Sequence, residues 1–172
     1  MQRNKTKQLT VCAMFAALGV ILLYLGSLVE VVDISMAVIA SLFCVLAVIE
    51  YGKGAPWMVF LVTALLSLLL LPNKSAAVYY TFFFGFYPIL KAYFERLDRV
   101  RSWICKEAVF NVCLAVIILL VKLLLMPGVS IPFMMYVIIV IMCEGVFILY
   151  DIALTRLITF YMYRLRHRFK FK

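Results

Sequence analysis

The feature that most constrains this chain is a succession of six long apolar stretches separated by short polar turns. The stretches comprise residues 9–29, 34–49, 56–71, 76–90, 108–126 and 131–150. A membrane-spanning helix needs about 20 mostly apolar residues, or fewer where flanking side chains snorkel or the bilayer thins. Of the 172 residues, 67% are hydrophobic and 15% are charged. This leaves too few polar residues to cover the surface of a soluble domain. The sequence therefore predicts an all-α integral membrane protein with six transmembrane helices, forming a single polytopic domain over residues 1–172.

The distribution of basic residues predicts how these helices are oriented. If both termini lie on one side of the membrane, that side carries 15 of the 17 lysines and arginines. The opposite side keeps only Lys74, and Lys122 lies within the fifth stretch. Basic residues are enriched in cytoplasmic loops, so we expect a multi-pass protein of the cell membrane with cytoplasmic N- and C-termini. An odd number of spans would place the termini on opposite sides of the membrane, and the basic residues would no longer gather on one side.

Two basic segments flank the predicted spans. The tail over residues 156–172 follows the sixth span directly and mixes cations with aromatic side chains. This position favours anchoring on anionic lipid headgroups over contact with nucleic acid, which we do not expect as a partner. Residues 91–107, between the fourth and fifth helices, alternate charged and apolar side chains. They predict either an amphipathic segment lying in the cytoplasmic interface or a helix that docks a partner protein.

Polar residues on the non-cytoplasmic side are the candidates for a binding site. Lys122 lies about 6 Å below the outer end of its helix, where a lysine is costly unless it snorkels, pairs or faces a wet cavity. One interpretation is an outward-facing pocket for a small-molecule substrate. The other is a snorkelling Lys122, solvated acidic turns and tyrosines in the interfacial aromatic belt. The candidates share one predicted depth on separate helices: Glu30, Asp33, Asn73, Lys74, Tyr79, Tyr80, Lys122 and Tyr136.

Two further patterns lie within the apolar stretches. Glu144 and Asn111 occupy similar depths in the cytoplasmic half, which predicts either a structural hydrogen bond or part of a proton or cation relay. Ala13 and Ala17 recur at four-residue spacing on the first helix. Such small residues allow close approach of another helix, either within the bundle or in a separate subunit.

The residues that catalysis and cofactor binding require are scarce. His167 is the only histidine, and the five cysteines form no C-x-x-C pair. Residues 52–54 lack the spacing of a phosphate-binding loop, and no span carries paired carboxylates. We therefore expect no enzyme, no metal site and no cofactor. The chain also lacks the polar stripe of a pore and the repeats of a secondary transporter.

With these features in place, the chain resembles the substrate-binding S component of energy-coupling factor (ECF) transporters. Six helices, cytoplasmic termini and a length of 172 residues agree with that family. The carrying segments are Lys5-Thr6-Lys7-Gln8-Leu9 with Ala13-Met14-Phe15-Ala16-Ala17, Val32-Asp33, Glu50-Tyr51-Gly52 and Phe84-Gly85-Phe86-Tyr87-Pro88-Ile89-Leu90-Lys91. The motifs that mark the riboflavin, thiamine and biotin branches are absent from the sequence.

The resemblance implies a membrane-embedded subunit that captures a vitamin or other micronutrient from the extracellular side. It implies docking through the alanine face at Ala13 and Ala17 on a transmembrane T subunit, which two ATPase subunits drive. It also implies that the eight outer-layer residues surround the substrate, and that toppling of the bundle carries the substrate inward. The rival interpretation is a non-transporting membrane scaffold of the rod-shape-determining MreD type, in which the same six helices hold partner proteins and no ligand pocket exists.

Overall fold

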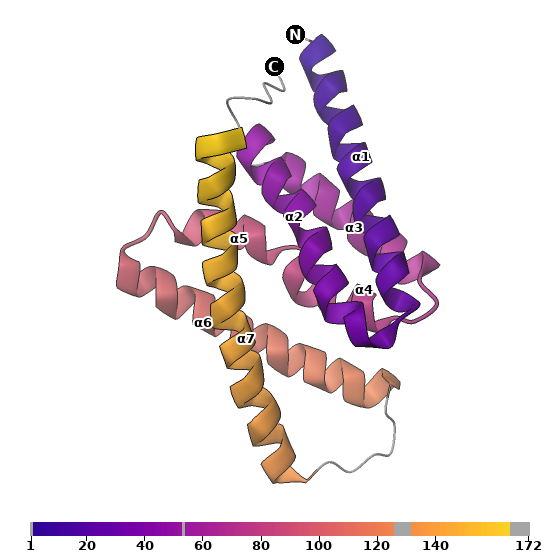
Figure 1. The fold of residues 1–172 in the computed structure, drawn as a ribbon, viewed down its shortest axis with the longest axis vertical. Coiled ribbons are helices and arrows are strands. Elements are labelled where there is room, and N and C mark those ends of the chain that lie inside the picture. The colour runs from indigo at the N-terminus through magenta and orange to yellow at the C-terminus, as the bar shows by residue number, and fades with distance from the viewer. Residues whose placement is uncertain (1, 53, 126–131, 166–172) are drawn as a thin grey trace. The chain divides into compact units, whose positions relative to one another are not determined.

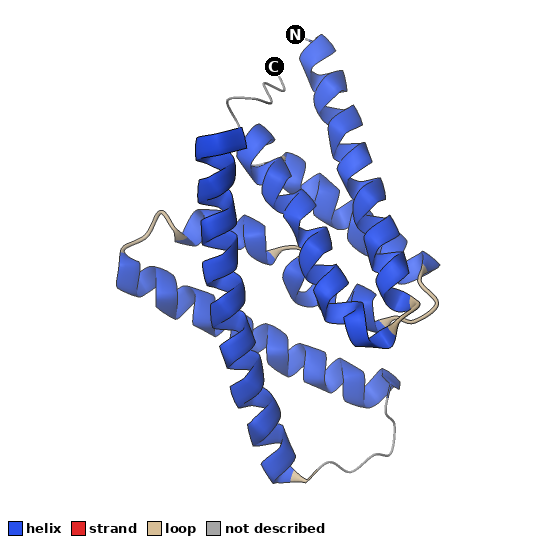
Figure 2. Cartoon of the chain, viewed as in Figure 1, coloured by secondary structure: helices blue, strands red, loops and turns tan. Residues whose placement is uncertain are grey.

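The computed structural model describes residues 2–52, 54–125 and 132–165, and all regular structure in these ranges is helical (Figures 1 and 2). The helices at the N-terminal end are α1 (Gln2–Ser27), α2 (Asp33–Tyr51) and α3 (Ala55–Leu70), with a 3-10 turn at Glu30–Val32. They are followed by α4 (Ser75–Tyr79), a π-helix (Tyr80–Phe84), α5 (Tyr87–Phe94), α6 (Arg99–Leu120), a π-helix (Val121–Leu125), α7 (Phe133–Phe160) and a last π-helix (Tyr161–Leu165).

Length and composition suit four of these helices to crossing a membrane. The segments are Lys5–Ser27, Asp33–Tyr51, Arg99–Leu123 and Met134–Arg164, and α3 is a shorter apolar helix of 16 residues. The predicted class of helical membrane protein is therefore confirmed. The count of six spans, the cell membrane and the cytoplasmic position of both termini stay predictions.

Two predicted elements differ from the structure. The fourth span, expected over residues 76–90, is divided into α4, the π-helix Tyr80–Phe84 and α5. The interfacial amphipathic segment over 91–107 is not a separate helix, because its start belongs to α5 and its end is continuous with α6. The tail predicted from residue 156 is helical through Leu165, and residues 166–172 lie outside the described part.

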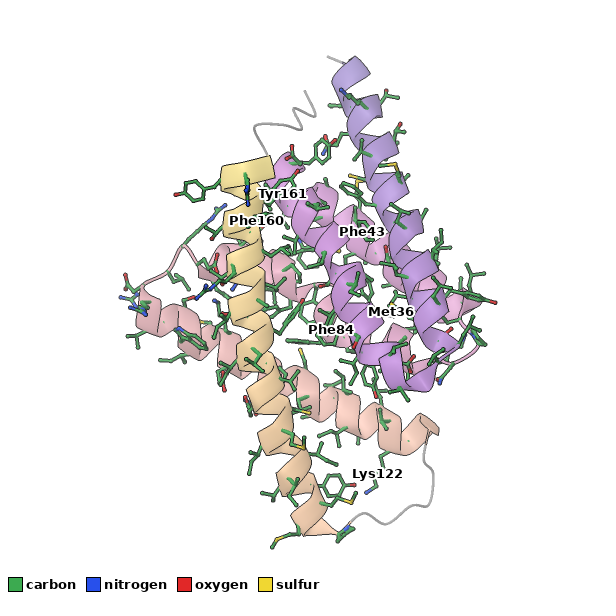
Figure 3. All side chains as sticks on the ribbon, in the orientation of Figure 1. Met36, Phe43, Phe84, Lys122, Phe160 and Tyr161 are labelled. Carbon is green, nitrogen blue, oxygen red and sulfur yellow. The ribbon has the colours of Figure 1, made fainter. Side chains whose placement is uncertain are left out.

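The chain separates into two units, residues 1–119 and 120–172. In the first, α1 packs along α2 and α3. Phe15 of α1 stacks on Phe43 of α2 with ring centroids 5.9 Å apart, and a Cβ added to Gly26 would lie 2.8 Å from Cβ of Met36. Met36 and Phe43 are labelled on α2 in Figure 3. The second unit comprises α7 with its flanking π-helices. That both units form a single domain stays a prediction.

Helix α3 shows how the first unit suits a lipid environment. Leu61, Leu65 and Leu69 recur every four residues and are 60%, 63% and 70% exposed, whereas Thr63 and Ser67 are buried. The buried hydroxyls are satisfied by main-chain acceptors: Ser67 Oγ donates to the carbonyl oxygen of Ala64 at 2.9 Å. A water-facing helix would place its polar residues outside. Leucine outside and hydroxyls inside is the arrangement that a hydrocarbon solvent favours.

The break in the fourth predicted span has a packing cause and a backbone cause. Gly85 N–H donates to the carbonyl oxygen of Tyr80 at 2.7 Å, which closes the wider π-type turn. An added Cβ on Gly85 would lie 2.6 Å from Cδ2 of Phe60 and 2.9 Å from Cε1 of Tyr80. Pro88 then lies in the first turn of α5, where a missing N–H is tolerated. The first helical segment therefore ends at Gly85, beside the rings of Phe60 and Tyr80, and a new helix, α5, begins at Tyr87.

We predict that Gly85→Ala destabilises the fold, because Phe60 and Tyr80 must move to admit the methyl group. The expected cost is about 1–3 kcal/mol, as for other overpacked cores. Thermal unfolding in detergent measures it. Gly145→Ala on α7 is the matched control, since no atom lies within 4 Å of its added Cβ. Equal unfolding temperatures of the two variants would contradict the close packing at Gly85.

Candidate functional site

Two of the predicted binding residues, Asp33 and Asn73, meet at one end of the first unit. Asp33 begins α2, and Asn73 lies in the turn between α3 and α4. Both contact the hydroxyl of Ser75, which donates towards Asp33 Oδ2 and lies 2.7 Å from Asn73 Oδ1. Asp33 is only 3% exposed. We call Asp33, Asn73 and Ser75 the Asp33 cluster.

Ser75 was missed by the sequence interpretation. A serine in a Pro-Asn-Lys-Ser turn is ordinary, and its position just before Ala76 and Ala77 indicates only a helix start. The signal that could have found it is the same turn sequence taken with Asp33, since an asparagine and a serine two residues apart can present two oxygens to one neighbour. Their convergence on Asp33 depends on the packing of α2 against α4, which the sequence does not show.

Lys74 does not join the Asp33 cluster. Its Nζ donates to the carbonyl oxygens of Leu68 at 2.8 Å and of Leu71 at 2.7 Å, at the C-terminal end of α3. These carbonyls have no partner within the helix, and a cation there also interacts favourably with the helix dipole. Lys74 therefore acts as a cap on α3, and its part in a ligand site stays a prediction.

The predicted tyrosines differ from one another in position. Tyr80 is fully buried, and its hydroxyl is hydrogen-bonded to Cys44 Sγ of α2 at 3.2 Å. Tyr80 thus holds α2 against the π-helix. Tyr79, its neighbour, is half-buried at the end of α4.

The remaining predicted residues are not brought into the Asp33 cluster. The side chain of Glu30 lies outside the described part. Lys122 and Tyr136 belong to the second unit. Lys122 is exposed on the π-helix Val121–Leu125 (Figure 3), and Tyr136 is half-buried on α7. Their participation in a shared pocket stays a prediction.

Asn111 and Glu144 are the two polar residues predicted deeper in the spans, and a hydrogen bond between them stays a prediction. Asn111 donates its Nδ2 to the carbonyl oxygen of Glu107 at 3.1 Å, one turn earlier in α6. Glu144 on α7 has a buried Oε2 without a hydrogen-bond partner among the described residues. One hydrogen of the asparagine amide is therefore already used within its own helix.

A second polar cluster lies at the opposite end of the first unit. Lys91 Nζ is 3.0 Å and Lys106 Nζ is 3.7 Å from the same carboxylate oxygen, Oε1 of Glu95. The lysine side chains are 1% and 6% exposed, and Glu95 is 41% exposed. Lys106 Nζ also lies 5.6 Å from the centre of the Trp103 ring. We call Lys91, Glu95 and Lys106 the Glu95 cluster. It joins α5 to α6, and so two of the cations expected in a lipid-facing segment are buried.

A small open pocket of about 70 Å³ lies near this end of the unit. Its walls come from the C-terminal end of α2, the start of α3 and α5. The guanidinium of Arg96 at its edge lies 5.7 Å from the centre of the Tyr93 ring. The lining residues are Val48, Gly52, Pro56, Ile89, Ala92, Tyr93 and Arg96. Its walls are mainly apolar, and its volume is smaller than that of typical ligand sites.

We predict that Glu95→Gln destabilises the protein, because two buried ammonium groups lose a shared carboxylate. A loss of about 1–3 kcal/mol is expected, at the scale of hydrogen bonds to charged groups. Asp98→Asn is the control: Asp98 pairs with Arg101 at 2.9 Å, but both side chains are more than 70% exposed. Exposed pairs contribute at most about 1 kcal/mol. Thermal unfolding measures the loss of stability in both variants. An equal loss would show that Glu95 contributes no more than an exposed surface ion pair.

No protein-family model, curated protein or solved structure matches this chain. A helical membrane fold hosts many activities, so function has to be argued from the sites themselves. The Asp33 cluster has one buried carboxylate and two neutral oxygen-bearing side chains. The Glu95 cluster has two buried cations. These two ends, chemically opposite, are the features on which a functional proposal can rest.

Proposed function

We propose that this protein is the substrate-capture subunit of an ECF-type importer, binding a vitamin or other small micronutrient from the extracellular side. The observation that supports this most is Asp33, a buried carboxylate whose Oδ1 has no hydrogen-bond partner among the described residues. An ionisable residue buried in a membrane helix is costly, and such residues mark substrate or ion sites more often than purely structural ones.

The predicted orientation gives the two clusters suitable positions. Under the distribution of basic residues, the turns that carry Asp33 and Asn73 face the outside, where a nutrient arrives. The Glu95 cluster then faces the cytoplasm, together with most of the chain's cations. In this arrangement the Asp33 end receives the substrate, and the Glu95 end is positioned near cytoplasmic partners.

The small residues of α1 support docking on a separate subunit. Ala16 and Gly19 are used within the first unit: Thr63 Oγ1 lies 3.5 Å from the carbonyl oxygen of Ala16, and a Cβ on Gly19 would lie 3.1 Å from Thr63 Cγ2. Ala13 and Ala17 are instead exposed. Their lack of side-chain bulk therefore serves no packing within the first unit, which favours their use by another membrane helix.

The exposed alanine face also favours the second candidate function, the membrane scaffold. A scaffold would dock through the same face but would carry no ligand. The two functions therefore share the docking surface and differ in whether a small molecule binds at the Asp33 cluster.

Mass spectrometry of the protein purified in mild detergent tests the capture function. We expect a small molecule to co-purify with the wild-type chain and to be lost from Asp33→Ala, because the substrate requires the buried carboxylate. The amount of small molecule that co-purifies with Lys122→Ala shows whether the second unit contributes to binding. A consistently empty wild-type protein that retains stable protein partners would favour the scaffold instead.

Replacement of Ala13 and Ala17 by leucine tests the docking face. The larger side chains keep the helix apolar but prevent close approach of a partner helix, so co-purification of the T and ATPase subunits should fall at least tenfold. Ala153→Leu is the control, since Ala153 is also exposed but lies on α7. Unchanged recovery of partners with the double variant would exclude this face as the docking surface.

A further inference from the structure

One carboxylate oxygen of the Asp33 cluster has no hydrogen-bond partner, and one hydroxyl hydrogen lies between two other oxygens. Ser75 N–H donates to Asn73 Oδ1 at 3.1 Å, and this bond fixes which end of the Asn73 amide is the oxygen. The Ser75 hydroxyl lies against that same oxygen and against Asp33 Oδ2. A hydroxyl has one hydrogen, so it satisfies one of the two acceptors. When the hydroxyl donates to Asp33 Oδ2, Asn73 Oδ1 keeps the Ser75 N–H as its donor.

The other carboxylate oxygen of Asp33, Oδ1, lacks a hydrogen-bond donor altogether. Asp33 Oδ1 is buried and has no hydrogen-bond partner, although the residue is 97% removed from solvent. Buried polar atoms are nearly always paired in native proteins, and an exception needs an explanation such as an ion. Asp33 Oδ1 is thus the position in the cluster at which an electropositive partner is missing.

The charge of Asp33 is not neutralised by the cation next to it in the turn. Lys74 is committed to the carbonyl oxygens of Leu68 and Leu71. Among the side chains that the structure describes, none forms a salt bridge with Asp33. The N-terminal end of α2 favours a carboxylate in its first turn, but a helix dipole offsets only part of the cost of burying an ion.

We propose that Asp33, Asn73 and Ser75 form a binding site for one monovalent metal cation, of which Na⁺ is the abundant extracellular example. All the available ligand atoms are oxygens, which suit hard cations and not soft transition metals. One carboxylate gives the site a charge of −1, which a single monovalent ion neutralises. Among the described residues, no three His, Cys, Asp or Glu side chains gather in one place, and so the multiple carboxylates of a divalent site are missing there.

A cation at this position would join two segments that are distant in the sequence. Asp33 belongs to the start of α2, while Asn73 and Ser75 belong to the turn before α4. The ion would bind the unpartnered Oδ1 of Asp33, and the amide oxygen of Asn73 and the hydroxyl oxygen of Ser75 are the further oxygen ligands that the cluster offers. Binding therefore holds the turn at residues 71–75 against α2, and loss of the ion releases it. This inference goes beyond the proposed capture function and holds whether or not a small molecule binds.

Thermal unfolding of the purified full-length protein tests the site. NaCl is titrated against N-methyl-D-glucamine chloride at constant ionic strength and pH, with no added substrate. We expect a saturable rise in unfolding temperature of about 3–6 °C at a Na⁺ concentration ten times the Kd, because the ion binds only the folded state. Asp33→Asn and Ser75→Ala should each lose this rise. Ser35→Ala, an exposed serine on the same helix, and Lys74→Met should keep it.

Direct binding of ²²Na⁺ to the same samples supplies the second measurement, with about one ion per wild-type chain expected. If Asp33→Asn does not fold, Ser75→Ala decides alone, since it retains the carboxylate. A rise in unfolding temperature that persists in both variants would overturn the proposal. So would stability that depends on Asp33 and on pH but not on Na⁺, which would identify a protonated carboxyl instead. A sodium response in a protein that retains no small molecule would leave this site standing while the capture function failed.

Discussion

The structure depends on one constraint: polar groups within an apolar solvent must find their partners inside the protein. The helices satisfy most of their backbone groups internally, and several buried serine hydroxyls follow the same principle. Ser41 Oγ donates to the carbonyl oxygen of Val38 and Ser67 Oγ to that of Ala64, at 2.6 and 2.9 Å. Lys74 extends it to a charged group by donating to two carbonyls at the end of α3. Four buried side-chain atoms in the described part lack a partner: Tyr51 Oη, Thr81 Oγ1, Glu144 Oε2 and Asp33 Oδ1, of which only Asp33 Oδ1 belongs to the Asp33 cluster.

The same constraint explains how the chain tolerates a break in its fourth apolar stretch. A helix that stops in hydrocarbon exposes carbonyls, so a break has to be covered by protein. Here the π-helix Tyr80–Phe84 ends at Gly85, and the rings of Phe60 and Tyr80 lie against it. Phe83 and Phe110 are in edge contact at 5.3 Å, which extends the aromatic cluster to α6. The rings of Phe60 and Tyr80 cover the backbone at Gly85, and Lys91 then meets Glu95 one turn later, at the end of α5.

The helices were predictable from the sequence because an apolar stretch in a membrane protein has few alternatives to a helix. The start of α2 near Asp33 and the turn at residues 72–75 also follow from local residue chemistry. Pairing between side chains was less predictable. Lys74 has an acidic residue and two main-chain carbonyls as possible partners, and only the fold decides between them. Lys91 and Lys106 were assigned to a lipid-facing segment because alternating charge is typical of one, yet both are buried. Ser75 carried no signal, since its importance comes from a contact with a residue 42 positions away.

The contrast between the two clusters limits what can bind at each end of the first unit. At the Glu95 end, the ammonium groups of Lys91 and Lys106 share one carboxylate oxygen, and both lysines have further interactions. At the Asp33 end every side-chain group in the cluster except one hydroxyl hydrogen and the amide hydrogens of Asn73 is an acceptor. The lysine that the sequence places beside it is occupied in capping α3. An anionic ligand would face a buried carboxylate with no cation to attract it. A positively charged partner would supply the charge and the coordination that the cluster is missing, and for that reason a cation is the occupant that this end of the molecule favours.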